Sequence, residues 1–193
     1  RLGADVKGID PAPANIAVAR AHAEMMELAD SGCRLEYLET TIEAVVASGQ
    51  RFDVVLAMEV VEHVANVEAF IAACAAAVKP GGILIMATLN RTLKAFALAI
   101  VGAEYVLGWL PRGTHQWERF IRPDELGTSL ASHGLELTGE AGVVYHPLSG
   151  TWRLSDDMDV NYMICASKPD GVKPPEVMPP EVKPPVTPSR GQS

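Results

Sequence analysis

The sequence has little cysteine, few aromatic side chains and no excess of basic charge over its 193 residues. Its three cysteines, Cys33, Cys74 and Cys165, are odd in number and include no Cys-x-x-Cys pair. A disulfide framework and a zinc ribbon are therefore not expected, and a reducing, cytoplasmic compartment fits best. Basic residues total 16 against 24 acidic ones, a net charge of -8. This balance argues against a broad nucleic-acid-binding surface.

Several loops that mark enzyme classes are also absent. No glycine-rich loop of the GxGxG type lies between a first strand and a first helix, and there is no GxSxG elbow and no P-loop. Residues 79–82 (Lys-Pro-Gly-Gly) form a predicted turn before a strand, which is the wrong polarity for a phosphate cradle. A hydrolase and a nucleoside triphosphatase are therefore disfavoured.

Strand-like and helix-like segments alternate over residues 1–168. Four apolar runs have strand character, at residues 4–10, 33–38, 52–58 and 83–88. Two alanine-rich segments have helical spacing, at residues 15–28 and 66–78. Strands that alternate with helices of this length predict an α/β fold with a parallel, doubly wound, Rossmann-like sheet and helices on both faces.

The second half of the chain departs from this alternation. A helix is expected to begin at residues 122–126, where proline and acidic residues fall in its first turn. Strands at 135–145 and 160–167 are expected to pair antiparallel at the edge of the sheet. Residues 169–193 hold eight of the 14 prolines, which predicts an extended, disordered tail outside the domain. A ligand for a proline-recognising domain is the alternative to a solvated spacer.

An apolar stretch at residues 93–110 has no place in the alternating pattern. Lys94, Glu104 and two glycines interrupt it, and a bilayer span needs about 20 apolar residues, so it is not expected to cross a membrane. It could lie flat on a surface as an amphipathic helix. The apolar stripe of that helix would be formed by Leu93, Phe96, Ile100 and Leu107. The alternative is an insertion, about residues 92–121, that packs on the domain.

Two strand ends could carry chemistry, because doubly wound sheets bind ligands at the carboxyl ends of their strands. Asp10 ends the first strand, and its carboxylate could accept hydrogen bonds from a ribose diol or cap the next helix. After the third strand, a helical turn would place Glu59, Glu62 and His63 on one face. They could hold a divalent cation or place a general base beside a hydroxyl. Alternatively, Glu62 caps the next helix and His63 packs against the sheet.

Two sets of motifs resemble a known enzyme family. The first set comprises Gly8-Ile-Asp10, Phe52-Asp-Val-Val-Leu-Ala-Met58-Glu59, Glu62-His63-Val64 and Val78-Lys-Pro-Gly-Gly82. It resembles the class I S-adenosylmethionine-dependent methyltransferases. The second set comprises Thr88-Leu-Asn-Arg-Thr92, Val101-Gly-Ala-Glu-Tyr105, Pro111-Arg-Gly-Thr-His115 and Asp159-Val-Asn-Tyr-Met163. It is similar to the ubiquinone biosynthesis O-methyltransferase family, and the similarity covers residues 1 to about 168.

The resemblance implies an enzyme that uses S-adenosylmethionine to methylate phenolic hydroxyls of polyprenylated ubiquinone precursors, of the 3-demethylubiquinol and 2-polyprenyl-6-hydroxyphenol type. It implies that Asp10 contacts the cofactor ribose and that Met58 lines the adenine pocket. It also implies a divalent cation, usually magnesium, whose ligands would be Glu59, Glu62 and His63. Direct removal of the phenolic proton by His63 or His115 is the alternative to the cation.

The resemblance further implies contact with anionic lipid through residues 93–120, hence peripheral association with the inner membrane, and a ubiquinone-biosynthesis protein complex as a partner. Basic residues that flank the apolar stripe could meet lipid phosphates, namely Arg91, Lys94, Arg112 and Arg119. The family's first strand and glycine-rich loop have no counterpart here, so an N-terminally truncated chain is expected. A non-catalytic, lipid-associating fragment and a nicotinamide-dependent oxidoreductase remain as alternatives.

Overall fold

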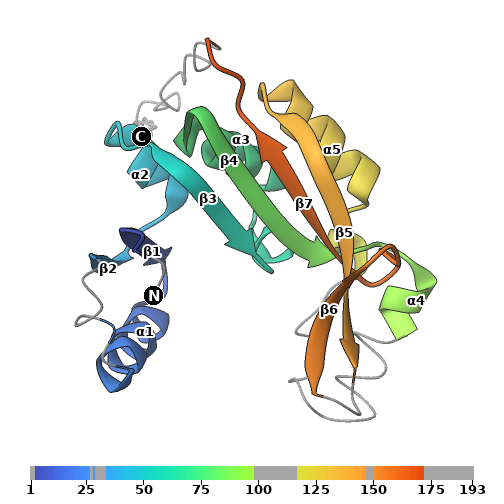
Figure 1. Cartoon of the computed structure of the whole chain (residues 1–193), viewed down its shortest axis with the longest axis horizontal. Coiled ribbons are helices and arrows are strands. Elements are labelled where there is room, and N and C mark those ends of the chain that lie inside the picture. The colour runs from blue at the N-terminus through green and yellow to red at the C-terminus, as the bar shows by residue number, and fades with distance from the viewer. Residues whose placement is uncertain (1–2, 27, 29–33, 98–116, 147–149, 172–193) are drawn as a thin grey trace, which may run out of the picture.

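Two separate β-sheets organise the chain, whose computed structural model describes residues 3–26, 28, 34–97, 117–146 and 150–171. Figure 1 shows a small pair of strands near the N-terminus and a larger sheet of five strands beside it. The predicted α/β class is confirmed. The single predicted sheet is wrong for the described residues, because the small pair makes no strand pairing with the larger sheet.

The small sheet is a β-α-β unit. β1 (Val6–Asp10) pairs in parallel with β2 (Leu35–Glu39), and α1 (Pro13–Met25) connects them. Proline suits the first turn of α1, because the N–H that it lacks would have no partner inside the helix. Gly8 lies directly opposite Tyr37, and a Cβ at Gly8 would come within 2.6 Å of the aromatic ring. A glycine is therefore required for the two strands to pair at this position.

The larger sheet joins a parallel pair to an antiparallel one, in the order β3-β4-β7-β5-β6. β3 (Phe52–Met58) and β4 (Val78–Leu89) run parallel. β7 (Asn161–Ser167) is antiparallel to both β4 and β5 (Glu136–His146), which confirms the predicted antiparallel pair. β6 (Thr151–Ser155), which the sequence pattern did not predict, pairs with the end of β5 and forms a hairpin that extends from the sheet in Figure 1.

The predicted turn at residues 79–82 is wrong, because β4 begins at Val78 and is already extended there. Gly82 passes so close to β3 that a Cβ on it would lie 2.7 Å from the carbonyl oxygen of Asp53. Gly81 has a φ of 74°, a left-handed conformation that favours glycine. The Pro-Gly-Gly sequence therefore lets the strand bend against its neighbour without leaving the sheet.

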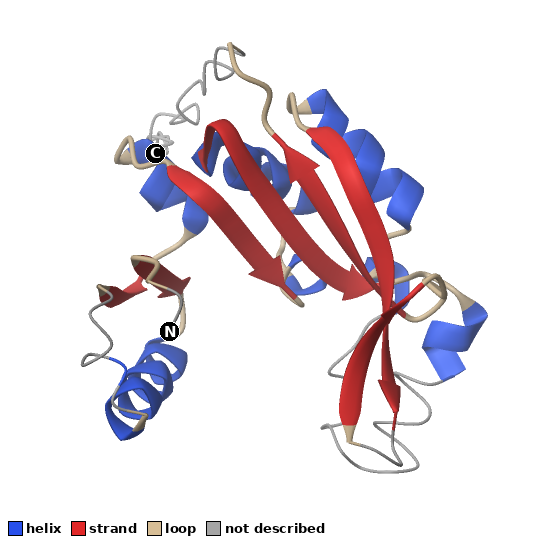
Figure 2. Cartoon of the chain, in the orientation of Figure 1, coloured by secondary structure: helices blue, strands red, loops and turns tan. Residues whose placement is uncertain are grey.

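Two helices cover one face of the larger sheet, as Figure 2 shows. They are α3 (Val67–Ala77) and α5 (Pro123–Ser132), and α2 (Ile42–Ala47) packs beside α3. Asn66 caps α3 by accepting a hydrogen bond from the Ala69 N–H at 3.0 Å. The main hydrophobic core lies between these helices and the sheet and includes Val55, Ala57, Ile71, Leu84, Met86, Leu126, Leu130, Tyr162 and Ile164.

The opposite face of β3 carries exposed apolar side chains. Alternation along the strand places Val55 and Ala57 in the core and leaves Val54, Leu56 and Met58 on the other face, where they are 50%, 63% and 45% exposed. Within the described part of the chain, no helix covers this face of the strand. Helices on both faces of one sheet are therefore not seen among the described residues.

The predicted insertion begins with a short helix, α4 (Leu93–Ala95). Ala95 is buried with Leu89 and Phe120 in a second, smaller core, whereas Leu93 is 82% exposed. Of the predicted stripe, Phe96 is 42% exposed, while Ile100 and Leu107 lie outside the described residues, as do most of the insertion and tail residues 172–193. None of the described helices is long and apolar enough to cross a membrane.

Candidate functional site

The carboxyl ends of β3 and β4 place the predicted site residues at one edge of the larger sheet. Met58, the last residue of β3, pairs with Ala87 of β4. The Glu59 N–H donates to the Ala87 carbonyl at 2.8 Å, so the parallel ladder continues one residue beyond the strand. Because parallel strands end at the same edge, the residues that follow β3 and β4 face one region of the surface.

Glu59 leaves the strand in a left-handed conformation, with a φ of 54°. Among the described residues it is the only one other than glycine with a positive φ. A short 3-10 helix, η2 (Val61–His63), follows it. The prediction of one helical turn from Glu59 to His63 is therefore wrong, and the two carboxylates are brought together by a backbone reversal instead. Such strained conformations cluster at functional sites.

Glu62 carries a buried carboxylate that is only partly satisfied. The residue is 3% exposed, and its Oε2 accepts a hydrogen bond from the Thr88 hydroxyl at 2.8 Å. Its Oε1 is buried and has no hydrogen-bond partner among the described residues. Burial of an unpaired carboxylate oxygen is costly. The geometry therefore leaves a site for a donor or a cation at Oε1. Glu62 does not cap α3, because Asn66 does.

Glu59 and Glu62 interact directly. Glu59 is exposed as a residue, but desolvation of its carboxyl raises its pKa to about 7, and repulsion and a hydrogen bond from Glu62 add to the shift. The raised pKa favours the neutral form of the Glu59 carboxyl beside Glu62, because two neighbouring anions would repel each other. Near neutral pH, Glu59 can therefore take up or release a proton, or a cation could offset the repulsion.

His63 does not join this pair in the described structure. It is the last residue of η2 and is exposed, and its backbone N–H donates to the Val60 carbonyl at 2.9 Å. Across the described ranges, no three His, Cys, Asp or Glu side chains converge closely enough to form a metal-ligand set. The second predicted base, His115, lies outside the described residues.

Asp10 makes two local hydrogen bonds at the end of β1. Its Oδ1 accepts from the Ala12 N–H at 2.7 Å, and its Oδ2 accepts from the Asn15 amide at 3.0 Å. These contacts order the irregular entry to α1, but Asp10 does not cap the helix, because the N-cap residue is Ala12 and it has no side-chain capping bond. Each carboxylate oxygen can accept a second hydrogen bond. Ribose binding therefore stays a prediction that this geometry allows.

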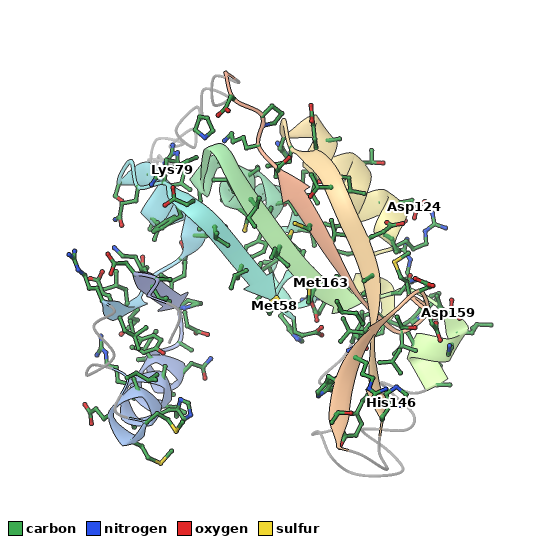
Figure 3. The ribbon with its side chains drawn as sticks, in the orientation of Figure 1. Met58, Lys79, Asp124, His146, Asp159 and Met163 are labelled. Carbon is green, nitrogen blue, oxygen red and sulfur yellow. The ribbon has the colours of Figure 1, made fainter. Side chains whose placement is uncertain are left out.

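Met58 belongs to an apolar row that crosses three strands. It pairs with Ala87, and Ala87 pairs with Met163 of β7. Figure 3 shows Met58 and Met163 at the same end of the sheet. Met163 was not predicted as a site residue, although it ends one of the motifs that carry the family resemblance. The pairing of β7 with β4, which brings it beside Met58, is not visible in the sequence.

Thr88 and Asn90 are further site residues that the sequence did not single out. Both lie in the Thr88-Leu-Asn-Arg-Thr92 motif, and both are buried. Arg91 in the same motif forms an ion pair with Glu125 of α5. The motif therefore connects the end of β4 to Glu62 through a hydrogen bond from Thr88 and to α5 through the ion pair of Arg91.

Comparison with known proteins decides the family. A family model described as a methyltransferase domain matches residues 1–140. The chain belongs to the methyltransferase domain family. This membership confirms the predicted fold class and argues against the nicotinamide-dependent alternative.

Two curated relatives of this methyltransferase domain bear the name Ubiquinone biosynthesis O-methyltransferase. The protein from Methylobacterium sp. (strain 4-46) is 59% identical over 169 residues, which cover 88% of this chain and 66% of the relative. The protein from Methylocella silvestris is 58% identical over 168 residues, which cover 87% of this chain and 64% of the relative. The chain thus spans slightly less than two thirds of the length of these relatives.

Solved structures show the same fold at low sequence identity. An S-adenosylmethionine-dependent methyltransferase from Thermotoga maritima, described as a possible histamine N-methyltransferase, matches with a TM-score of 0.57 and 16% identity, over 84% of this chain and 72% of that one. An O-methyltransferase family protein from Burkholderia thailandensis matches with a TM-score of 0.59 and 17% identity, over 87% of this chain and 45% of that one. At such identities the likeness establishes the fold alone.

Proposed function

We propose that the protein transfers a methyl group from S-adenosylmethionine to phenolic hydroxyls of polyprenylated ubiquinone precursors, of the 3-demethylubiquinol and 2-polyprenyl-6-hydroxyphenol type. The observation that carries the proposal is 59% identity over 169 residues to a relative named for this step. The paired carboxyls and unpartnered oxygen at the ends of β3 and β4 support it, because they can bind donors and receive a proton.

In this proposal, the apolar row and Asp10 bind the methyl donor. S-adenosylmethionine supplies an electrophilic methyl group on a sulfonium. Asp10 accepts hydrogen bonds from the ribose hydroxyls with the lone pairs that Ala12 and Asn15 leave free. Met58, which is 45% exposed at the end of β3, contacts the adenine. As the phenolic oxygen bonds to the methyl carbon, the carbon–sulfur bond breaks, and the hydroxyl proton passes to a base.

Binding of the methyl donor can be measured directly on the whole protein. S-adenosylhomocysteine should raise the unfolding temperature, since a ligand that binds only the folded state stabilises it. NAD should leave that temperature unchanged. Asp10→Ala should abolish the stabilisation, whereas Asp5→Ala, at the start of the same segment, should preserve it. Stabilisation by NAD, or none by S-adenosylhomocysteine, would contradict the proposal.

We also propose that Glu59, Glu62 and His63 hold a divalent cation, which we assign as magnesium. The donor chemistry of the two glutamates fits, because carboxylate oxygens are the ligands that magnesium prefers, whereas His63 would contribute a nitrogen. A cation held by Glu59 and Glu62 would offset the repulsion between the two carboxylates and satisfy the buried Oε1 of Glu62. His63 would need to turn toward the two carboxylates. When bound, the cation would lower the pKa of a coordinated phenolic hydroxyl.

The cation proposal is tested by Glu62→Ala with and without added magnesium. Loss of a buried ligand should remove most activity of the whole protein, and millimolar magnesium should restore part of it. Glu39→Ala, at the end of β2, serves as the control and should behave like the original protein. Full activity of Glu62→Ala in a chelator would contradict the proposal. In that case His63 or His115 takes the phenolic proton directly.

Residues 93–120 carry the proposed contact with anionic lipid, so that the protein associates peripherally with the inner membrane. Two observations support this placement. Leu93 and Phe96 expose apolar surface at the start of the segment, and Arg119 is exposed near its end. A prenylated substrate resides in that membrane, which gives the contact a purpose. A complex with other ubiquinone-biosynthesis proteins would serve the same purpose by passing the substrate on.

A further inference from the structure

Asn90 continues the edge of the sheet beyond β4. Its backbone N–H donates to the Val160 carbonyl at 2.7 Å, which extends the antiparallel ladder between β4 and β7 by one residue. Alternation along a strand therefore places the Asn90 side chain on the same face as Thr88, two residues earlier. Asn90 is 8% exposed, so its amide is almost wholly buried at the end of the strand.

One hydrogen bond fixes the orientation of this amide. The Asn90 Nδ2 donates to the Met158 carbonyl oxygen at 2.9 Å. A carbonyl oxygen can only accept, so the amino group must face Met158 and the Oδ1 must face away from it. That Oδ1 is buried and has no hydrogen-bond partner in the described part of the chain. Nearly all buried polar atoms in folded proteins have a partner, so an unpaired Oδ1 calls for an explanation.

Three side-chain donors in this part of the fold already have other partners. The Thr88 hydroxyl donates to Glu62, and the Tyr162 hydroxyl donates to the Ile121 carbonyl at 2.9 Å. The Arg91 guanidinium pairs with Glu125. Two buried acceptors thus remain without a donor among the described residues, the Asn90 Oδ1 and the Glu62 Oε1. Thr88 relates their positions, because it bonds to Glu62 and precedes Asn90 by two residues along the same edge of β4. A ligand that contacted both oxygens would bring a donor to each, or a donor to one and a cation to the other.

We propose that the Asn90 Oδ1 accepts a hydrogen bond from the substrate hydroxyl that is not methylated, next to the one that reacts. This inference rests on the proposed function, whose substrates carry two neighbouring phenolic hydroxyls, and it adds the residue that recognises the second one. The neutral amide makes this contact whether Glu62 binds the reacting hydroxyl or a cation. Asn90 is then a specificity-determining residue, because a site built to pair a hydroxyl discriminates against an analogue that lacks it.

The test compares two acceptors in the whole protein. One is 2-prenyl-6-hydroxyphenol, and the other is 3-prenylphenol, which lacks only the neighbouring hydroxyl. The original protein should favour the first by roughly 10- to 100-fold in kcat/KM, because the second leaves Oδ1 unpaired. Asn90→Leu, which keeps the branched side-chain shape but has no acceptor, should reduce this preference to within about threefold of unity. The change should appear mainly as a higher KM for the dihydroxy compound.

A control separates substrate binding from support of the segment just before β7, which Asn90 contacts at Met158. Thr92 contacts the same segment, because its hydroxyl donates to the Asp159 carbonyl at 2.5 Å. Thr92→Val should lower the unfolding temperature but retain the preference for the dihydroxy compound. Loss of the preference in Thr92→Val, or an unchanged preference in Asn90→Leu, would overturn the assignment of Asn90.

The original protein alone supplies a second measurement if Asn90→Leu does not fold. Calorimetric titration should give weaker binding for 3-prenylphenol than for the dihydroxy compound, and equal affinities would overturn the inference. Failure of the proposed function gives a different result, since the original protein would then methylate neither compound. Methylation of both compounds with equal kcat/KM would leave the proposed function standing and remove the role of Asn90.

Discussion

At the scale of single residues, Glu59 combines two unfavourable features in one position. Its backbone adopts a left-handed conformation, and its carboxyl lies against that of Glu62, which helps raise its pKa to about 7. A left-handed conformation costs a residue with a Cβ about 1–2 kcal/mol. Neither feature stabilises the fold, since glycine would adopt this backbone conformation without strain. We infer that stability is sacrificed at this position for the chemistry of the paired carboxyls.

This inference predicts that Glu59→Gly makes the protein more stable and less active. Glycine adopts a positive φ without strain and removes the repulsion from Glu62, so the free energy of unfolding should rise by about 1 kcal/mol. Methyl transfer should fall at least tenfold, since one of the paired carboxyls is lost. Urea denaturation and a turnover assay on the same preparation measure both effects.

Glu39→Gly is the matched control for this prediction. Glu39 ends β2 as Glu59 follows β3, but its φ is not positive. Glycine should therefore destabilise the protein at that position by about 0.5–1 kcal/mol. A Glu59→Gly variant that is destabilised like Glu39→Gly would show that the left-handed conformation carries no strain.

The sequence predicts candidate site residues where their role depends on position along a strand. It does not predict them where their role depends on contacts between distant side chains. The sequence predicts Asp10 at the end of a strand and Glu62 shortly after one, and both lie at such positions. The helical turn from Glu59 to His63 was wrong, because a positive φ at a glutamate leaves no trace in the sequence. Asn90 was missed as a site residue because its unpaired oxygen becomes visible only when the partners of its amide are known.

At the scale of helices and strands, capping residues and the spacing of apolar residues predict most of the elements. The helix expected at residues 66–78 is α3, which begins after its Asn66 cap. Its expected end at residue 78 is one residue beyond the observed end, Ala77. The sequence does not show that Lys168, which follows β7, closes this end of the helix. The buried Lys168 ammonium donates to the carbonyls of Ala75 and Val78 at 2.9 and 3.1 Å. A cation is favourable at that end of a helix dipole, which compensates in part for burial that lowers its pKa.

The two helices that cover the larger sheet are joined by Glu68 of α3. It accepts hydrogen bonds from Ser129 at 2.8 Å and pairs with His133 at 2.7 Å, both at the C-terminal half of α5. These contacts lower the pKa of Glu68 below its usual 4.5, with the hydroxyl of Ser129 as the larger cause. A carboxyl with a lower pKa in the folded state stabilises the fold above its unfolded pKa, and this stability is lost as pH falls.

We therefore expect Glu68→Gln to be less stable than the original protein at neutral pH. The difference in free energy of unfolding should be at most about 1 kcal/mol, because Glu68 is largely exposed and solvent screens the interaction. It should shrink as the pH falls through the lowered pKa of Glu68, where the original carboxyl is itself protonated. Urea denaturation at about pH 7 and about pH 3 measures both values. A difference that persists unchanged in acid would contradict this account of Glu68.

At the scale of the whole molecule, the alternation of strands and helices predicted the α/β class but not how the strands are distributed. Among the residues that the structure describes, β1 and β2 pair with no other strand, and the far face of β3 exposes Val54 and Leu56. The sequence also did not show that β7 inserts between β4 and β5, because pairing between distant strands depends on tertiary packing. That insertion brings Met163 into line with Met58 and holds Asn90 at the end of β4, so it positions residues to which we assign roles in the proposed function.

The parallel strands β3 and β4 place the carboxyls of Glu59 and Glu62 and the amide of Asn90 at one edge of the sheet. We expect methyl transfer to a phenolic hydroxyl at this edge. The most direct measurement incubates the whole protein with S-adenosylmethionine carrying an isotopically labelled methyl group and 2-prenyl-6-hydroxyphenol. We predict that the label appears in one aryl methyl ether, with S-adenosylhomocysteine formed in equal amount, and that Glu62→Ala removes the product. Formation of S-adenosylhomocysteine without a labelled ether, or no turnover of either compound, would contradict the claim.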